Sequence, residues 1–235
     1  MFVVSKMKFI VDKKFFEKIP NACFGVIIAK NINNKQYDWV KELLDEQVKN
    51  IQIKYENQKA KEIPEIMLYR EAFRQIDINP NKFMCAIESL VSRTLKQGFV
   101  PNINSLVDLG NALSLKYIIP LGIHDIDKLK GDIEIRFANE EDIFIPFNGE
   151  EETPDLNEVI YASGHDVRTR RWTWRQGENG KVDENIKSAF IPLDAFTENK
   201  DNMLELQQEL KELLSKIGAD CILGYVDKDN NVFEW

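Results

Sequence analysis

The side chains best suited to binding and chemistry are concentrated between residues 168 and 176. This stretch, RTRRWTWRQ, joins four arginines and two tryptophans in a chain whose formal net charge is −8. Alternate side chains of a β-strand share a face, so a strand here would separate the nine residues into two sets. One set holds Arg168, Arg170, Trp172, Trp174 and Gln176, and the other holds Thr169, Arg171, Thr173 and Arg175. The first face could stack an aromatic group or a base and bind phosphate or carboxylate through its guanidinium groups.

A second interpretation of the same stretch is purely structural. The tryptophans would fill the core, and the arginines would pair with residues 140–158, which contain eight acidic residues and no basic one. Ion pairs of this kind are common on protein surfaces. Both interpretations remain open from the sequence, and they are compatible if they apply to opposite ends of the stretch.

Metal and cofactor chemistry is not predicted. The chain has two histidines, His124 and His165, and three widely spaced cysteines without a CxxC pair, so the usual zinc ligand spacings cannot be assembled. His165 lies in a polar Ser-Gly-His-Asp turn, where shaping the turn is its expected role. The isolated cysteines favour a reducing compartment, and residues 1–12 lack the apolar segment of a signal peptide, so we expect a cytoplasmic protein.

The elements that position these residues follow from hydrophobic spacing and chain breakers. Strands are predicted at residues 8–11, 23–29, 158–162, 167–176, 189–193 and 221–226, with a last one ending at Trp235. Residues 131–147 alternate in two runs, which predicts a hairpin of two strands joined by an acidic turn. Helices are predicted at residues 13–18, 37–61, 83–95, 104–116 and 203–217, the third and fifth of them followed by Gly98 and Gly218 as C-terminal stops.

The pattern predicts one α+β domain covering residues 1–235, with a mixed β-sheet core flanked by helices. An α/β segment occupies residues 1–64, a core occupies 65–198, and a C-terminal helix and hairpin occupy 199–235. No segment has the roughly 20 apolar residues that a membrane-spanning helix needs. The acidic balance also argues against tight non-specific binding of nucleic acid. Neither a membrane nor DNA is expected as a partner.

Residues 102–130, NINSLVDLGNALSLKYIIPLGIHDIDKLK, carry a resemblance to a known family. Their order of an Asn-rich turn, Val-Asp, an Asn, a Pro, a His and Asp-Lys-Leu resembles the B3/B4 domain of the phenylalanyl-tRNA synthetase beta subunit. Residues 131–142, GDIEIRFANEED, are similar to the strand and acidic turn that come next in that family, and residues 159–176 look more like its stand-alone bacterial members. The resemblance is diffuse and covers roughly residues 69–196.

The resemblance implies an α+β fold with a pocket between its two halves. In the synthetases this pocket hydrolyses tyrosine wrongly attached to the tRNA. It therefore implies tRNA or aminoacyl-tRNA as partner and a small aromatic amino acid as a possible ligand. Ester hydrolysis needs a held water and donors to the developing oxyanion. We expect His124 to orient water or act as a base near neutral pH, and Asn111 to donate to a carbonyl or oxyanion; the alternative is that both are structural.

The substrate-binding residues expected beside His124 and Asn111 are Asn104, Arg168, Arg170, Trp172, Trp174, Arg175, Gln176 and Asp194. The sequence departs from the family at one informative point. Where the synthetases carry a glutamate associated with the tyrosine hydroxyl, this chain has Leu193, and Asp194 follows it. A second departure is Gly110, where the synthetases often have threonine.

Three hypotheses follow. The first is an RNA-binding protein that acts in trans on aminoacyl-tRNA as a deacylase, without ligase activity. The second is a non-catalytic binder of a small aromatic or anionic molecule. The third is an interaction module that contacts a protein partner through the helix expected at residues 37–61.

Overall fold

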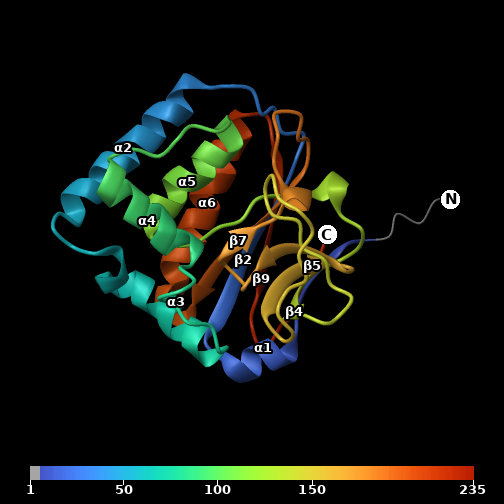
Figure 1. Ribbon diagram of the computed structural model, residues 1–235. Helices are drawn as coiled ribbons and strands as arrows, with labels where there is room; N and C mark the ends of the chain where they lie inside the picture. Colours follow the sequence, from blue (N-terminus) through green and yellow to red (C-terminus); the bar gives the residue numbers. More distant parts are fainter. Residues whose placement is uncertain (1–5) are drawn as a thin grey trace.

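The structure of the protein is a computed structural model in which residues 6–235 are described (Figure 1). Strands and helices alternate up to residue 37, only helices follow between residues 38 and 117, strands dominate residues 124–196, and a helix and two strands close the chain. The strands are β1 (Lys8–Val11), β2 (Ala22–Lys30), β3 (His124–Asp125), β4 (Ile133–Phe137), β5 (Val159–Ser163), β6 (Asp166–Arg170), β7 (Arg175–Gln176), β8 (Ala189–Phe196), β9 (Asp220–Val226) and β10 (Val232–Glu234). The α-helices are α1 (Lys13–Lys18), α2 (Asp38–Lys54), α3 (Pro64–Gln75), α4 (Ala86–Gln97), α5 (Ser105–Tyr117) and α6 (Lys200–Lys216), and the 3₁₀ turns are η1 (Ala60–Glu62), η2 (Ile126–Lys128), η3 (Glu178–Gly180) and η4 (Thr197–Asn199).

The strands form two sheets. The first has the order β10-β1-β4-β5-β6-β7 and the second the order β3-β8-β2-β9. All pairs are antiparallel except β1 with β4, so the first sheet is mixed. Figure 1 shows α2, α4, α5 and α6 gathered on one side of the molecule and β4 and β5 on the other. The α+β fold predicted from the sequence is confirmed.

The second sheet lies in the middle of the molecule because its two long strands are apolar on both faces. Every residue of β8 is buried, and in β2 only the last residue is exposed. Such continuous apolar runs are typical of strands covered on both sides. On one face the sheet packs against α6, which in turn contacts α5. On the other it meets the first sheet across an aromatic core containing Phe9, Phe24 and Phe190.

Three differences from the sequence prediction affect the site. The prediction of a hairpin within residues 131–147 is wrong in its second strand. β4 pairs with β5 instead, and residues 143–146 make only isolated bridges. The helix α3 was not predicted, although Pro64 stands at its first turn, where proline is favoured. The strand expected over residues 167–176 ends at Arg170, since Arg171 and Trp172 adopt positive φ angles of 48° and 58°.

No helix in the described part of the chain is long and apolar enough to cross a membrane.

A buried ion pair joins α3 to α4. Nη1 of Arg70 lies 2.7 Å from the Glu88 carboxylate, with side-chain exposures of 8% and 3%. Removing one member leaves the other charge buried without a partner. We therefore expect Arg70→Met to lower the free energy of unfolding by roughly 3–5 kcal/mol. The double variant Arg70→Met with Glu88→Met should recover most of this loss in urea denaturation at neutral pH. A double variant no more stable than the single one would contradict the explanation.

Candidate functional site

A small cavity of about 70 Å³ lies between the two sheets and beside the first turn of α4. Because a water molecule takes up about 30 Å³, the cavity has room for about two of them. Its inner wall consists of buried side chains, and its outer wall includes the exposed Ala86 and Arg175. The lining residues are Ala86, Pro120, Leu121, Gly122, His124, Tyr161, Thr169, Trp172, Thr173, Trp174, Arg175, Gln176, Pro192 and Asp194.

Asp194 supplies the carboxyl group of the cavity. Its Oδ1 accepts hydrogen bonds from the Tyr161 hydroxyl at 2.7 Å and from Nε1 of Trp172 at 2.6 Å. None of the described residues donates to Oδ2, which leaves that oxygen for a ligand or water. Burial raises the pKa of Asp194 from 3.8 to about 7, against the opposing effect of the two hydrogen bonds. The carboxyl group therefore changes its charge close to neutral pH.

The neighbouring residue on β8 points the other way. Leu193 belongs to the apolar cluster between the second sheet and the helices, and its side chain contacts the position of Gly25 on β2. Side chains alternate along a strand, so Asp194 faces the first sheet. The residue that stands where the family has glutamate therefore lies outside the cavity, and the carboxylate one position later lies inside it.

His124, at the start of β3, is buried and lines the same cavity as Asp194. Its ring stacks on Tyr161 with centroids 6.1 Å apart, and a Cβ at Gly180 would lie 3.0 Å from Nδ1. Burial, helped by the positive charge of Arg168, lowers the pKa of His124 from 6.5 to about 3. The expected role of a base near neutral pH is therefore not supported. A neutral imidazole can still hold a water through one ring nitrogen, and Nδ1 has no hydrogen-bond partner among the described residues.

The turn after β6 places Trp172 against Asp194. Arg171 and Trp172 both have left-handed backbone conformations, which are unfavourable for bulky residues and persist only where the surroundings hold them. The indole of Trp172 is fully buried and contacts Phe15 and Phe196 edge-on. The turn ends the alternation assumed in the sequence analysis, so the predicted single face with two arginines and two tryptophans is wrong.

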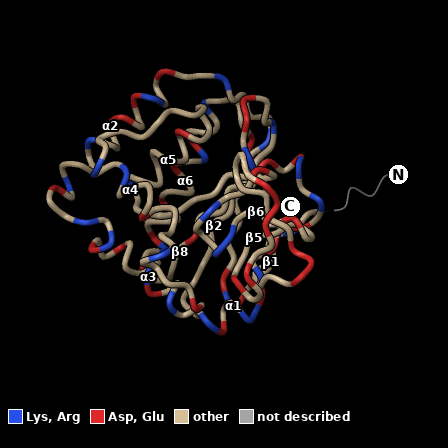
Figure 2. The backbone as a smooth tube through the Cα atoms, viewed as in Figure 1, with Lys and Arg blue, Asp and Glu red and all other residues tan. Residues whose placement is uncertain are grey.

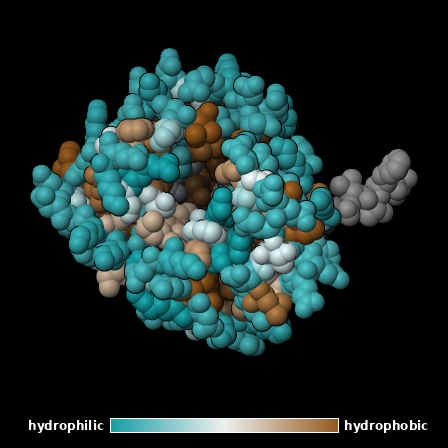
Figure 3. All heavy atoms as spheres, in the orientation of Figure 1, coloured by the Kyte–Doolittle hydropathy of each residue, from teal (hydrophilic) through white to brown (hydrophobic). Residues whose placement is uncertain are grey.

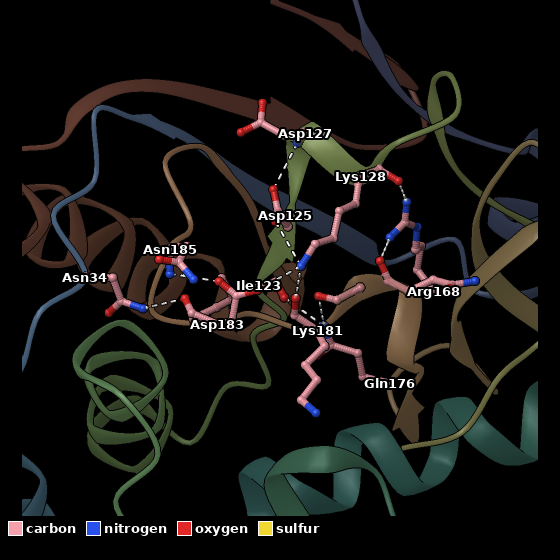
Figure 4. A network of polar contacts seen from close by, with 12 residues as sticks. Asn34, Ile123, Asp125, Asp127, Lys128, Arg168, Gln176, Lys181, Asp183 and Asn185 are labelled. Atoms are coloured by element: carbon pink, nitrogen blue, oxygen red, sulfur yellow. Dashed lines mark hydrogen bonds and ion pairs between the residues drawn. The ribbon is translucent and has the colours of Figure 1, made fainter. Parts of the chain in front are cut away.

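Two of the three predicted arginines, Arg168 and Arg170, are buried and already paired. Arg168 has no exposed surface and donates hydrogen bonds to the main-chain oxygens of Asn179 and Lys128 (Figure 4). Arg170 binds the Glu158 carboxylate through two donors at 2.8 Å and Glu152 through a third at 2.9 Å. The structural interpretation, in which the acidic stretch neutralises arginines and a tryptophan fills the core, is confirmed for Arg170 and Trp172.

The outer wall of the cavity holds Trp174, Arg175 and Gln176. Arg175 is exposed, and its guanidinium lies 5.9 Å from the Trp174 ring centroid. Gln176 is fixed, because its Nε2 donates to the main-chain oxygens of Ile123 and Gly180, both at 2.8 Å (Figure 4). Its Oε1 is therefore the atom that remains free to accept a hydrogen bond from a ligand.

A network around Lys128 fixes the segment that follows Gln176. The Lys128 ammonium contacts the carboxylates of Asp125 and Asp183 at 3.2 and 3.3 Å and the main-chain oxygen of Lys181 at 3.1 Å. Figure 4 shows these groups converging on Lys128, next to the Arg168 contact. The network ties Lys181 and Asp183 to Asp125, the residue that follows His124 in β3.

Asn111 lies in a second cavity of about 380 Å³, which shares Leu121 and Gln176 with the first. A Cβ at Gly110 would lie 3.0 Å from Ile123 and 3.1 Å from Leu121, so a threonine there would displace this wall. Figure 3 shows a hollow with apolar residues between the helical and β-rich sides. The cavity is lined by Ile103, Val107, Gly110, Asn111, Leu121, Ile123, Phe147, Asn148, Gln176, Lys181 and Val182.

The structure thus brings together six of the ten predicted site residues, namely His124, Trp172, Trp174, Arg175, Gln176 and Asp194. Asn111 is in the adjoining cavity. Asn104 lies in neither: it caps α5, accepting from the main-chain nitrogen of Val107 and from Asn34, both at 3.1 Å. Tyr161 was not predicted as a site residue: its place in an apolar strand indicated that it would be buried, but no local signal indicated that it would meet Asp194.

No group of three or more His, Cys, Asp or Glu side chains within residues 6–235 is arranged to hold a metal ion.

Comparison with known families identifies the domain. The family model for the B3/4 domain matches residues 68–221, more than half of the chain. The chain belongs to the B3/4 domain family. The match includes every lining residue of both cavities and extends beyond residue 196, where the resemblance seen in the sequence ends.

Two proteins of known family are similar to this B3/4 domain. The phenylalanine–tRNA ligase beta subunit of Fusobacterium nucleatum is 28% identical over 121 residues, which are 52% of this chain and 15% of the ligase subunit. The crystal structure of an N-terminal fragment of the phenylalanyl-tRNA synthetase beta subunit from Pyrococcus horikoshii aligns with a TM-score of 0.50 at 13% identity. That alignment covers 92% of this chain and 50% of the fragment, and it shows a shared fold. The chain therefore spans only part of either relative.

The two buried titrating groups predict opposing effects of pH on stability. The folded pKa of Asp194 lies above its ordinary value, so folding takes up a proton and stability falls as pH rises from about 4 to 7. The folded pKa of His124 lies below its ordinary value, so its contribution to stability rises between about pH 3 and 6.5. In wild-type protein the two slopes largely offset each other between about pH 4 and 6.5.

Single variants should separate the two slopes. In urea denaturation at about pH 4.5, 5.5 and 6.5, Asp194→Asn should gain stability with rising pH relative to wild type, and His124→Asn should lose it. Asparagine at 194 keeps an oxygen that can accept from Tyr161 and Trp172. Parallel pH curves for the three proteins would show that neither group titrates as its burial requires.

Proposed function

We propose that this B3/4 domain acts in trans on aminoacyl-tRNA in the cytoplasm and hydrolyses the ester that holds a wrongly attached amino acid. The observation that carries the proposal is the pair of adjoining cavities. One has room for about two water molecules and contains a carboxyl group that titrates near neutral pH, and the other is larger and mostly apolar. The kinship with beta subunits of enzymes named as tRNA ligases supports tRNA as the partner.

The smaller cavity suits the attacking water. Ionised Asp194 can take a proton from a water held at its free Oδ2, since its pKa of about 7 is near the operating pH at which a general base is most effective. His124 stays neutral and orients the water through a hydrogen bond. The Tyr161 and Trp172 donors hold the carboxylate in one position, so it does not reorient during the proton transfer.

The larger cavity suits the amino acid. Its volume of about 380 Å³ lies within the usual range for small-molecule sites, and Val107, Ile123 and Val182 give it an apolar wall. The amide of Asn111 can donate to the ester carbonyl, where negative charge develops. Gln176 lies on the shared wall, where its Oε1 can accept from the α-ammonium group. The absence of a carboxylate at position 193 favours an apolar side chain over tyrosine as the substrate, because Asp194 already holds the hydroxyl of Tyr161.

A deacylation assay over a panel of mischarged tRNAs tests the proposal. We expect wild-type protein to release at least one amino acid, with kcat/KM rising through about pH 7 as Asp194 ionises. Asp194→Asn should lower the rate by at least about 100-fold and abolish this pH step. Asn111→Ala should lower it without moving the pH step. The matched control is Asp142→Asn, which removes a buried carboxylate paired with Arg136 away from both cavities. Release no faster than in buffer for every tRNA would refute the proposal.

Non-catalytic binding of a small aromatic or anionic molecule is the second candidate, supported by the aromatic rim of Trp174 and the exposed Arg175 at the smaller cavity. A binder is stabilised by its free ligand, whereas a strict tRNA editor responds little to one. If the protein acts as an editor, free amino acids and nucleotides should leave the melting temperature unchanged within about 1 °C in a thermal shift assay. A rise of several degrees with one aromatic or anionic compound, lost in Arg175→Ala and Trp174→Ala, would establish the binder instead.

A further inference from the structure

A groove lies between the end of α2, the segment leading to η1, and α4. We call it the α2–α4 groove; its volume is about 940 Å³. Most of its residues precede the region matched by the B3/4 family model, which begins at residue 68. It is lined by Gln52, Ile53, Tyr55, Glu56, Asn57, Gln58, Lys59, Ala60, Lys61, Met84, Glu88, Ser92, Leu95 and Lys96.

The charge of the groove is opposite to that of the chain as a whole. Lys59, Lys61 and Lys96 are exposed and form no ion pair with any described residue. Glu88 is neutralised by Arg70 beneath the groove, which leaves Glu56 as the one unpaired acidic side chain among the lining residues. Figure 2 shows lysines and arginines along the segment after α2 and on α4. In a protein of net charge −8, the groove is a local positive surface.

A second feature of the groove points to a ligand. Tyr55 lines the groove with only 5% of its surface exposed; the Lys54 ammonium, which is a donor, lies 5.0 Å from its ring centroid, and no described residue accepts a hydrogen bond from its hydroxyl. A buried hydroxyl without a partner destabilises the protein, because the group has lost its water and gained nothing in exchange. A ligand with an acceptor oxygen in the groove would satisfy it. The amides of Gln52, Asn57 and Gln58 add further donors and acceptors to the same groove.

The groove lies next to the smaller cavity. Ala86, in the first turn of α4, lines the cavity, while Met84 and Glu88 on either side of it line the groove. The backbone of this turn is held to the cavity wall by the hydrogen bond from Ala86 to the Thr173 carbonyl at 2.6 Å. A chain-like ligand lying in the groove can therefore reach the cavity by passing one helical turn.

We propose that the α2–α4 groove binds the phosphate backbone of the RNA whose acylated end enters the two cavities, an inference that rests on the proposed function. The three free lysines neutralise phosphates, and the Tyr55 hydroxyl donates to a phosphate or ribose oxygen. This assigns backbone binding to residues 52–61 and 84–96 rather than to the arginines of residues 168–171, which are buried in internal contacts. An acidic protein segment is the competing occupant.

The test uses fluorescence anisotropy with labelled bulk tRNA at low salt. The groove variant carries Lys59→Glu, Lys61→Glu and Lys96→Glu. The control variant carries Lys13→Glu, Lys187→Glu and Lys228→Glu, which are also exposed and unpaired within the described residues and cause the same change in net charge. We expect the groove variant to bind at least about ten-fold more weakly than the control, with a salt slope smaller by about 2 to 3. Tyr55→Phe should weaken binding by a smaller factor while raising thermal stability.

Three results would overturn the inference: equal loss of binding in the two triple variants, no binding of tRNA by the wild type, or displacement of tRNA by polyglutamate as effectively as by unlabelled RNA. Deacylation by wild-type protein is measured in parallel. Release of an amino acid together with one of these results would reject the groove and keep the proposed function. Groove-dependent binding without any release would reject the hydrolase and keep the groove.

Discussion

Asp194 is the residue on which the arrangement of the site depends, because it is bound from four directions. Its carboxyl group accepts from Tyr161 on the first sheet and from Trp172 in the turn after β6. Its main-chain oxygen accepts from the Tyr69 hydroxyl on α3, and its main-chain nitrogen donates to Pro120. One residue in the middle of β8 thus connects both sheets, a helix and the segment that leads to His124. Buried polar groups of this kind specify one packing of their neighbours, provided that each is satisfied.

This arrangement has an energetic consequence for function. A carboxyl group buried away from bulk water resists ionisation, and a buried histidine in the same cavity resists protonation. The pair therefore stays uncharged over a wide range of acid pH, while the carboxyl group still ionises near neutrality. Polar groups that reduce stability are retained in proteins where they serve a function. The strained turn at Arg171 and Trp172 belongs to the same pattern, since its backbone conformation brings the indole donor to the carboxylate.

The sequence predicted those parts of the structure that depend on local patterns. The helices around residues 86–97 and 200–216 are confirmed, with Gly98 in the left-handed conformation expected of a C-terminal stop. The site could be predicted only in part, because its decisive contacts join distant residues. Alternation from Arg168 onward could not show that the chain would leave the strand at Arg171. Likewise, no local signal distinguished Leu193 from Asp194 as the side chain facing the cavity, since the choice depends on which face of β8 meets the first sheet.

Charge illustrates the same difference between local and tertiary information. The arginine-rich stretch was the expected meeting point with phosphate, yet the acidic residues 152–158 neutralise Arg170 and Arg171 within the fold. Lys59, Lys61 and Lys96, which were not predicted as site residues, form no ion pair among the described residues and line the α2–α4 groove. Phosphate binding depends on the positive charge that remains accessible after folding, not on the number of basic residues in a segment. A chain with a net charge of −8 can therefore present a surface for RNA, provided that most of its acidic residues lie elsewhere or are neutralised internally.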